Sequence, residues 1–202
     1  MKTFDQKRFV AWTLATLLAS TPLFAQDKAG QSDDPSKMSM EQFQKNAALG
    51  HIHHINQKEI QLSKMAQDKS QSKQVKDFAQ HMITDHQNAD RRVMEMAEAQ
   101  NVKLPDLQLA GYEKATSEQL DKMKGTQFDQ AFFMQMDLEH KMAAQELEAI
   151  RSSVKDPQIA ALIDGILPTV REHQKSAARF EKSQGQMAGQ IHPESKTHTN
   201  DK

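Results

Sequence analysis

The sequence predicts an all-α fold, a ferritin-like four-helix bundle with a short extra helix in the connector between helices 2 and 3. Apolar residues recur at intervals of three and four along four long segments, which is the spacing of the buried face of an α-helix. No segment shows the two-residue alternation of a half-buried strand. The breaks after the first and third segments are short and the middle break is long, as in bundles with one crossover connection.

The first half of the bundle is predicted from two helical segments. Ser39 and Gln42 have the spacing of a capping box, with Ser39 as N-cap, so a long helix is expected from there to about residue 69. A second helix is expected from about Ser72 to residue 100, because its core-facing positions alternate by four and three. These positions are Val75, Ala79, Met82, His86, Ala89, Val93 and Met96.

The middle of the chain is predicted to cross from one end of the bundle to the other. Residues 103–111 contain Pro105 and form a connector, and a short helix is expected over 112–124 with Gly125 just after its end. Because thirty helical residues span only about 45 Å, this stretch is long enough to travel the length of the bundle. An up-down-up-down order of helices stays open as an alternative.

The second half of the bundle repeats the hairpin. A third helix is expected from about Thr126, and Asp156 with Pro157 supplies an N-cap and a first-turn proline for a fourth helix that continues to residue 183. Pro168 is expected to kink this fourth helix.

The ends of the chain have a different composition from the bundle. Lys2 and Lys7 precede an apolar run over residues 9–18, which is too short for a bilayer span of about 20 residues, and Ala25 follows as a cleavage residue. We therefore expect a signal peptide over residues 1–25, a flexible leader over 26–38, the bundle over 39–183, and a disordered polar tail over 184–202. The mature protein is expected to be periplasmic or secreted, with association with the outer membrane left open.

Composition excludes several classes of function. The chain has no cysteine, which removes disulfides, lipid-modified cysteine and thiolate-bound metals. The formal net charge is −1 and the single Trp lies in the predicted signal, so no nucleic-acid partner is expected. No transmembrane segment is predicted, and protein partners cannot be inferred.

Each long helix carries one ionisable residue on its core-facing side, namely Glu59, His86, His140 and His173. All four lie near the middle of their helices, within about two turns of one level. Buried polar groups must satisfy one another, bind water or bind an ion. Because three imidazoles and a carboxylate suit Zn, Fe, Mn or Cu, the sequence predicts a single transition-metal ion at these residues, with Glu59 as fourth ligand or charge partner.

Two other interpretations of this cluster stay open. It could only fix helix register in a structural or stress-related protein that binds no metal. A di-iron oxidase would need two Glu-x-x-His motifs, whereas only Asp137 and His140 have that spacing, because Ile83 and Val170 occupy the corresponding places on the other helices. No catalytic residue is predicted.

Neighbouring residues could support the imidazoles. Asp85 adjoins His86, and Asp137 and Glu139 flank His140, so these carboxylates could hold ring nitrogens, although helical neighbours usually point elsewhere.

Met82 and Met136 precede His86 and His140 by four residues. A thioether with an imidazole suits Cu(I), although such methionines more often fill the core.

Further histidines are not assigned to the site. His51 is expected to face inward about one turn from it, whereas His53 and His54 are expected at the solvent. His192 and His198 lie in the predicted tail.

The joint order and spacing of these residues resembles an exported bacterial family known as domain of unknown function 4142. The matching positions are 59–62, Met65, Ala66, 75–79, Met82, Asp85, His86, Ala89, Leu104, Pro105, Gly125, Phe128, Asp129, Ala131, Phe132, Met136, His140, Leu167, Pro168, His173 and Ala177.

The resemblance implies a ferritin-like fold and a periplasmic or outer-membrane-associated protein. It implies no activity, because the family is functionally uncharacterised. Glu59, His86, His140 and His173 fall on positions of the family's pattern, whereas the cluster from His51 to His54 departs from it.

Overall fold

The computed structural model describes residues 38–190. The predicted signal peptide, nearly all of the predicted leader and residues 191–202 lie outside this range. Within it the structure contains helices and no strands, which confirms the all-α prediction. The helices are α1 (Met40–Lys69), α2 (Lys73–Ala99), α3 (Gly111–Lys122), α4 (Gly125–Ser153) and α5 (Pro157–Gln190).

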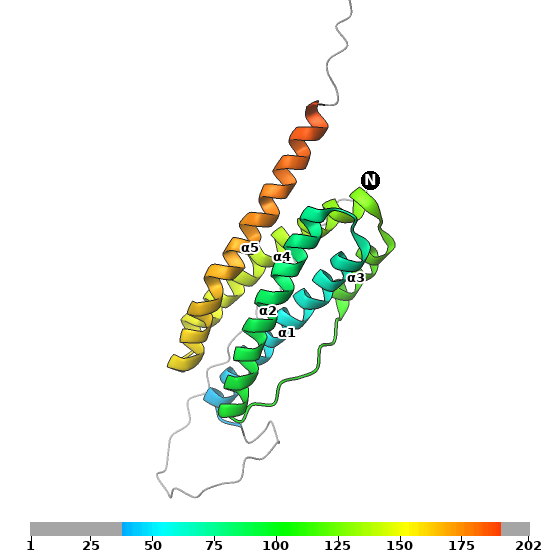
Figure 1. Ribbon diagram of the computed structural model, residues 1–202. Coiled ribbons are helices and arrows are strands. Elements are labelled where there is room, and N and C mark those ends of the chain that lie inside the picture. The colour runs from blue at the N-terminus through cyan, green and yellow to red at the C-terminus, as the bar shows by residue number, and fades with distance from the viewer. Residues whose placement is uncertain (1–37, 191–202) are drawn as a thin grey trace, which may run out of the picture. The chain divides into compact units, whose positions relative to one another are not determined.

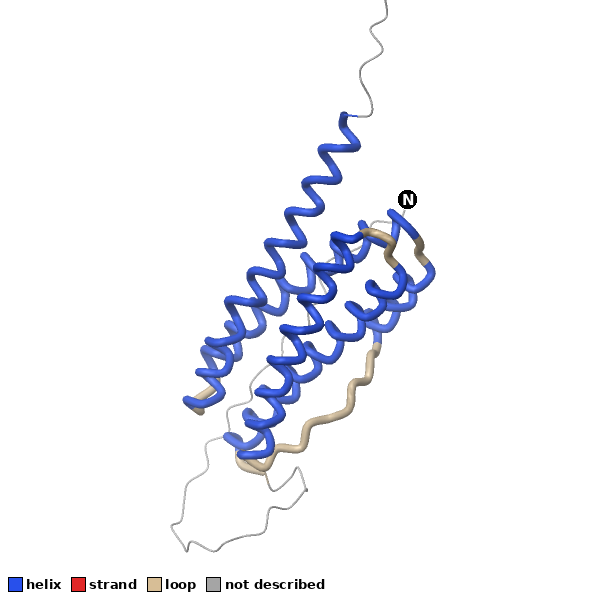
Figure 2. Tube along the Cα trace, in the orientation of Figure 1, coloured by secondary structure: helices blue, strands red, loops and turns tan. Residues whose placement is uncertain are grey.

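The four long helices form two antiparallel hairpins that pack into one bundle. α1 packs along α2 and α4 along α5, with further contacts between α1 and α4 and between α2 and α5. The loop after α2 and the short α3 run along the bundle, so α4 starts at the end of the bundle where α2 starts (Figures 1 and 2). α2 and α4 therefore run in the same direction, which is the ferritin-like order and rules out the up-down-up-down alternative.

Local capping signals set where α1 and α5 begin. The Ser39 hydroxyl accepts a hydrogen bond from the Gln42 amide at 3.1 Å, as the capping box predicts. The Gln42 side chain instead donates to Asn46, so the reciprocal half of the box does not form. At α5, Asp156 Oδ1 accepts from the backbone amides of Gln158 and Ile159 at 2.8 and 3.2 Å, which confirms Asp156 as the N-cap.

Two helix ends differ from the prediction. α3 ends at Lys122, and Gly125 opens α4 with a φ of 55° instead of following α3 directly. This left-handed conformation suits glycine and lets the chain turn within two residues. α5 continues through Pro168 and past residue 183 to Gln190, a stretch that includes good helix formers. Disorder over residues 191–202 stays a prediction.

The core consists of two apolar clusters separated along the bundle. One contains Leu49, Ile52, Leu147 and Ile163, and the other contains Phe128, Phe132, Phe133 and Phe180. Between them every long helix contributes buried polar side chains. This polar layer comprises Asn56, Glu59, His86, Asp90, Glu139, His140 and His173.

We predict that Asp156→Ala lowers the free energy of unfolding by about 1 kcal/mol, because it removes the N-cap of α5. It also removes the 2.9 Å ion pair with Lys45 of α1. Urea denaturation followed by circular dichroism measures the change. Asp164→Ala serves as control, because Asp164 makes only an exposed pair with Arg151 and should change stability little. Equal stability of the two variants would contradict the assignment of the cap.

Candidate metal centre

Three imidazole rings meet in the polar layer. His86 comes from α2, His140 from α4 and His173 from α5, and their relative exposures are 4%, 1% and 7%. The ring centroids lie 5.3 to 5.6 Å apart. Each ring offers one nitrogen to a group in which all three nitrogens lie within 4.8 Å of one another. The sequence prediction that these three histidines converge is therefore confirmed.

The outer nitrogen of each ring donates a hydrogen bond to a fixed acceptor. His86 Nδ1 donates to Asn56 Oδ1 at 2.9 Å, and His140 Nδ1 donates to the carbonyl oxygen of Met136 at 2.8 Å. His173 Nε2 donates to Asp85 Oδ2 at 2.9 Å. With these tautomers, the unprotonated nitrogens are Nε2 of His86, Nε2 of His140 and Nδ1 of His173.

The three unprotonated nitrogens have no donor to accept from. His173 Nδ1 is buried and without a hydrogen-bond partner. The Nε2 atoms of His86 and His140 face each other at 3.4 Å, and neither carries a hydrogen in these tautomers. Two lone pairs at this separation repel, whereas a cation between them would satisfy both.

Burial keeps all three rings neutral at physiological pH. It lowers the pKa of His86 well below 6.5, and the neighbouring rings lower it further. Burial likewise lowers the pKa of His140 to about 3. The pKa of His173 is lowered by burial, with partial opposition from the Asp85 carboxylate. Neutral imidazole is the form that binds metal ions.

The separation of two of the three donor nitrogens fits a tetrahedral metal site. Metal–imidazole bonds of about 2.0–2.1 Å in a tetrahedral site place the donor nitrogens about 3.4 Å apart. This matches the 3.4 Å between the Nε2 atoms of His86 and His140. Three protein ligands leave a fourth position open.

Glu59 does not join this group. It is buried and lies against Glu139, and both burial and the neighbouring carboxylate raise its pKa well above 4.5. The Oε2 atoms of both residues are buried without a donor from any other group, so a proton shared between the two carboxyl groups satisfies both. Burial and the second carboxylate therefore favour the protonated form of Glu59, and a protonated carboxyl group is a poor metal ligand.

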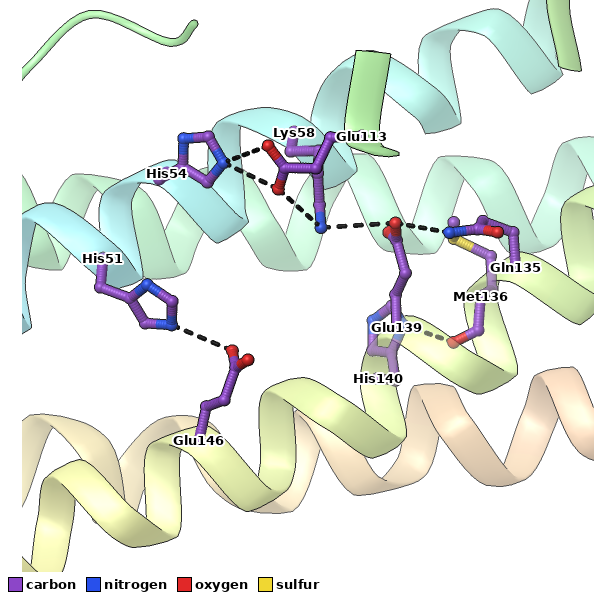
Figure 3. Close-up of polar contacts among 9 residues, drawn as sticks. All are labelled: His51, His54, Lys58, Glu113, Gln135, Met136, Glu139, His140 and Glu146. Atoms are coloured by element: carbon purple, nitrogen blue, oxygen red, sulfur yellow. Dashed lines mark hydrogen bonds and ion pairs between the residues drawn. The ribbon is translucent and has the colours of Figure 1, made fainter. Parts of the chain in front are cut away.

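Glu139 belongs to a second polar group on the side of α1 and α3 (Figure 3). Lys58 Nζ lies 3.4 Å from Glu139 and 3.5 Å from Glu113 of α3, and Gln135 donates to Glu139 at 2.6 Å. Burial lowers the pKa of Lys58, but the surrounding carboxylates outweigh it and the net pKa is raised. The ammonium group therefore already supplies the cation that these carboxylates need.

The extra histidines of α1 each pair with a carboxylate on a different helix. His51 contacts Glu146 at 3.0 Å and its side chain is 40% exposed, so it lies at the edge of the bundle and not inside it. His53 contacts Asp90 at 2.6 Å and His54 contacts Glu113 at 3.0 Å, with side-chain exposures of 12% and 28%. The prediction that His53 and His54 face solvent is wrong, because α2 and α3 cover them.

The supporting carboxylates also differ from the expectation. Asp85 does hold a ring nitrogen, but that of His173 on α5 and not that of its neighbour His86. Asp137 accepts instead from Gln174. Sequence reasoning missed Asn56, whose only signal is its position one turn before Glu59 on the same face of α1.

Met82 and Met136 belong to the apolar cluster around Phe132. This position suits core filling.

Solved structures of similar fold include a DUF305 fragment and copper-bound forms of CopM. A DUF305 fragment from Deinococcus radiodurans matches with a TM-score of 0.63 and 14% identity, over 69% of this chain and 96% of that one. CopM in the Cu(I)-bound form matches with a TM-score of 0.58 and 16% identity, over the same shares. CopM in the Cu(II)-bound form matches with a TM-score of 0.57 and 17% identity, over 69% and 97%. At these identities the likeness shows the fold alone.

No curated protein matches the chain. The family model described as Domain of unknown function (DUF4142) matches residues 28–180, which is most of the sequence and the whole of the bundle up to the late part of α5. The chain therefore belongs to the DUF4142 family.

Proposed function

We propose that this protein binds a single transition-metal ion, copper in particular, through His86, His140 and His173. The observation that carries the proposal is the convergence of three buried, neutral imidazoles whose unprotonated nitrogens have no hydrogen-bond donor. Such lone pairs cost free energy in the apo protein, and a metal ion removes that cost.

The donor set favours copper among the metals that the sequence allows. Mn prefers carboxylate and water oxygens, whereas imidazole suits Cu, Zn and Fe. At a given nitrogen site, divalent copper binds more tightly than zinc or iron. CopM, which has a similar fold, was solved in Cu(I)-bound and Cu(II)-bound forms. The protein would then hold copper in a cysteine-free site.

The amino-terminal signal motif supports an exported protein. We place its action in the periplasm or outside the cell, where a site without thiols is not exposed to oxidation of its ligands. None of the helices over residues 38–190 is apolar and long enough to cross a bilayer.

A di-iron oxidase fits this site poorly. Residues 38–190 contain one group of three histidines and no second metal-ligating group. Asp85 is already bonded to His173, and the buried carboxylates Glu59 and Glu139 lie against each other and against Lys58. The remaining competitor is a structural bundle whose polar layer only fixes helix register.

We predict that protein isolated without a polyhistidine tag binds one equivalent of Cu(II) and gains thermal stability, because the metal binds only the folded state. His140→Ala should lose both the tight equivalent and the stabilisation. Metal analysis after dialysis and thermal unfolding with and without copper measure the two effects.

His81→Ala is the matched control, because His81 is an exposed histidine of α2 outside the triad. It should behave like the unaltered chain. Equal copper content in the His140→Ala protein, or no bound metal in any form, would leave only the structural interpretation.

Removing the carboxylate behind His173 should weaken metal binding without abolishing it. Asp85→Ala frees His173 Nε2 and is expected to lower copper affinity about 10-fold to 100-fold, the usual effect of losing such a support. Competition titration with a chelator of known affinity measures the loss. Asp77→Ala, on the same helix and paired only with exposed Lys73, should leave the affinity unchanged.

The depressed pKa of His140 predicts a pH-dependent stability of the apo protein. The folded-state pKa is about 3 and the unfolded value about 6.5, so below pH 6.5 the unfolded chain binds a proton that the folded chain does not. The stability linked to His140 is thus complete above pH 6.5 and falls by roughly 1 kcal/mol per pH unit towards pH 3. Glu59, whose folded pKa is raised, acts in the opposite direction.

Comparison with His140→Leu isolates this effect, because Glu59 titrates in both proteins. Both apo proteins are unfolded with urea at pH 7, 5 and 4. As the pH falls, the unaltered chain should lose stability relative to the His140→Leu variant. A difference that stays constant over this range would show that His140 is not buried in its neutral form.

A further inference from the structure

A pocket opens beside the three histidines, between α2 and α5. Its volume is about 130 Å³, and its lining includes Asn56, His86, Arg92, Gly165, Thr169 and His173. Two of the three candidate ligands therefore border the pocket, and a metal ion bound to them would present its open fourth position there. The volume is enough for a small polyatomic ligand or a few waters.

The pocket carries hydrogen-bond donors that nothing else uses. Asn56 is 2% exposed, and its Nδ2 group is buried without a partner while its Oδ1 holds His86. Arg92 is an exposed residue, and its guanidinium makes no hydrogen bond or ion pair within residues 38–190. The one carboxylate in the lining, Asp85, accepts from His173. An anion in the pocket would give both free donors an acceptor.

Gly165 accounts for where the guanidinium lies. A Cβ at this position would stand 2.9 Å from Arg92 Nη2, so any larger residue would displace the guanidinium. Glycine inside a helix costs about 1 kcal/mol relative to alanine, and its backbone here has ordinary helical φ, so conformational freedom does not require it. The close approach of Arg92 to α5 is the feature that glycine permits.

With a divalent metal ion bound, the net charge of the site would also favour an anion. The three imidazoles are neutral, and the charges of Arg92 and Asp85 cancel. A divalent ion would therefore leave two uncompensated positive charges beside a pocket lined by free donors.

We propose that the pocket binds a small inorganic anion, which occupies the fourth position of the metal and is held by Arg92 and Asn56. This inference rests on the proposed function, since the anion completes the same metal site. The chemical class is a monovalent anion of a few atoms, of which azide is a convenient probe.

Azide titration of the Cu(II)-loaded protein tests the proposal. Azide bound to Cu(II) produces a charge-transfer absorption band, so the band intensity reports occupancy of the fourth position. Arg92→Met keeps an unbranched apolar stem and removes the guanidinium with its charge, and it should weaken azide binding about tenfold, as expected for one charge-assisted hydrogen bond. Copper affinity should stay unchanged, because Arg92 makes no hydrogen bond with any of the three histidines.

Two further variants sharpen the test. Arg91→Met removes an adjacent exposed arginine that bonds Asn88 and does not line the pocket, so it should bind azide like the unaltered chain. Gly165→Ala keeps Arg92 but displaces its guanidinium, so it should weaken azide binding while leaving copper bound.

The outcomes separate the two proposals. Failure of the unaltered chain to bind copper overturns the proposed function itself. Copper binding with no azide band, or with equal azide affinity in the Arg92→Met and Arg91→Met proteins, overturns the anion site and leaves the metal site standing.

Discussion

Each ring nitrogen of a buried imidazole needs a hydrogen-bond partner or a metal ion, because a polar atom left facing hydrocarbon costs about 1–3 kcal/mol. In this bundle the outer nitrogens of His86, His140 and His173 each meet an acceptor, and the inner ones meet only one another. The inner nitrogens are therefore buried acceptors that have no hydrogen-bond donor. Asn56 and Asp85 meet the needs of the outer nitrogens, the polar layer that they form with the histidines lies between the two apolar clusters, and a bound cation would meet the needs of the inner nitrogens.

The fold could be predicted because its signals are local. Periodic apolar positions, with Ser39 and Asp156 as caps, depend on neighbouring residues and predict the four helices. The length of the middle connector favoured the ferritin-like order, and only the structure ruled out the up-down-up-down alternative. The convergence of His86, His140 and His173 followed from counting residues along those helices. Gly125 was misplaced because one left-handed glycine can close one helix or open the next.

The details of the site could not be predicted because they depend on pairs from different helices. Glu59 lies at the expected level, but whether it faces the histidines or Glu139 depends on helix rotation, which periodicity does not fix. His53 and His54 are covered by α2 and α3, and no pattern within α1 indicates this. Arg92 approaches Gly165 closely because glycine has no side chain, and the two residues are far apart in sequence, so no local pattern indicates this contact.

The two hairpins contribute unequally to the histidine cluster, and this bears on the order of assembly. The hairpin of α1 and α2 supplies His86 with its support Asn56, whereas the hairpin of α4 and α5 supplies His140 and His173. Contacts within each hairpin are local in sequence, which favours their early formation, and docking of the two halves comes last. A metal ion bound by all three histidines would connect the two hairpins, so its binding would strengthen their docking and slow their separation.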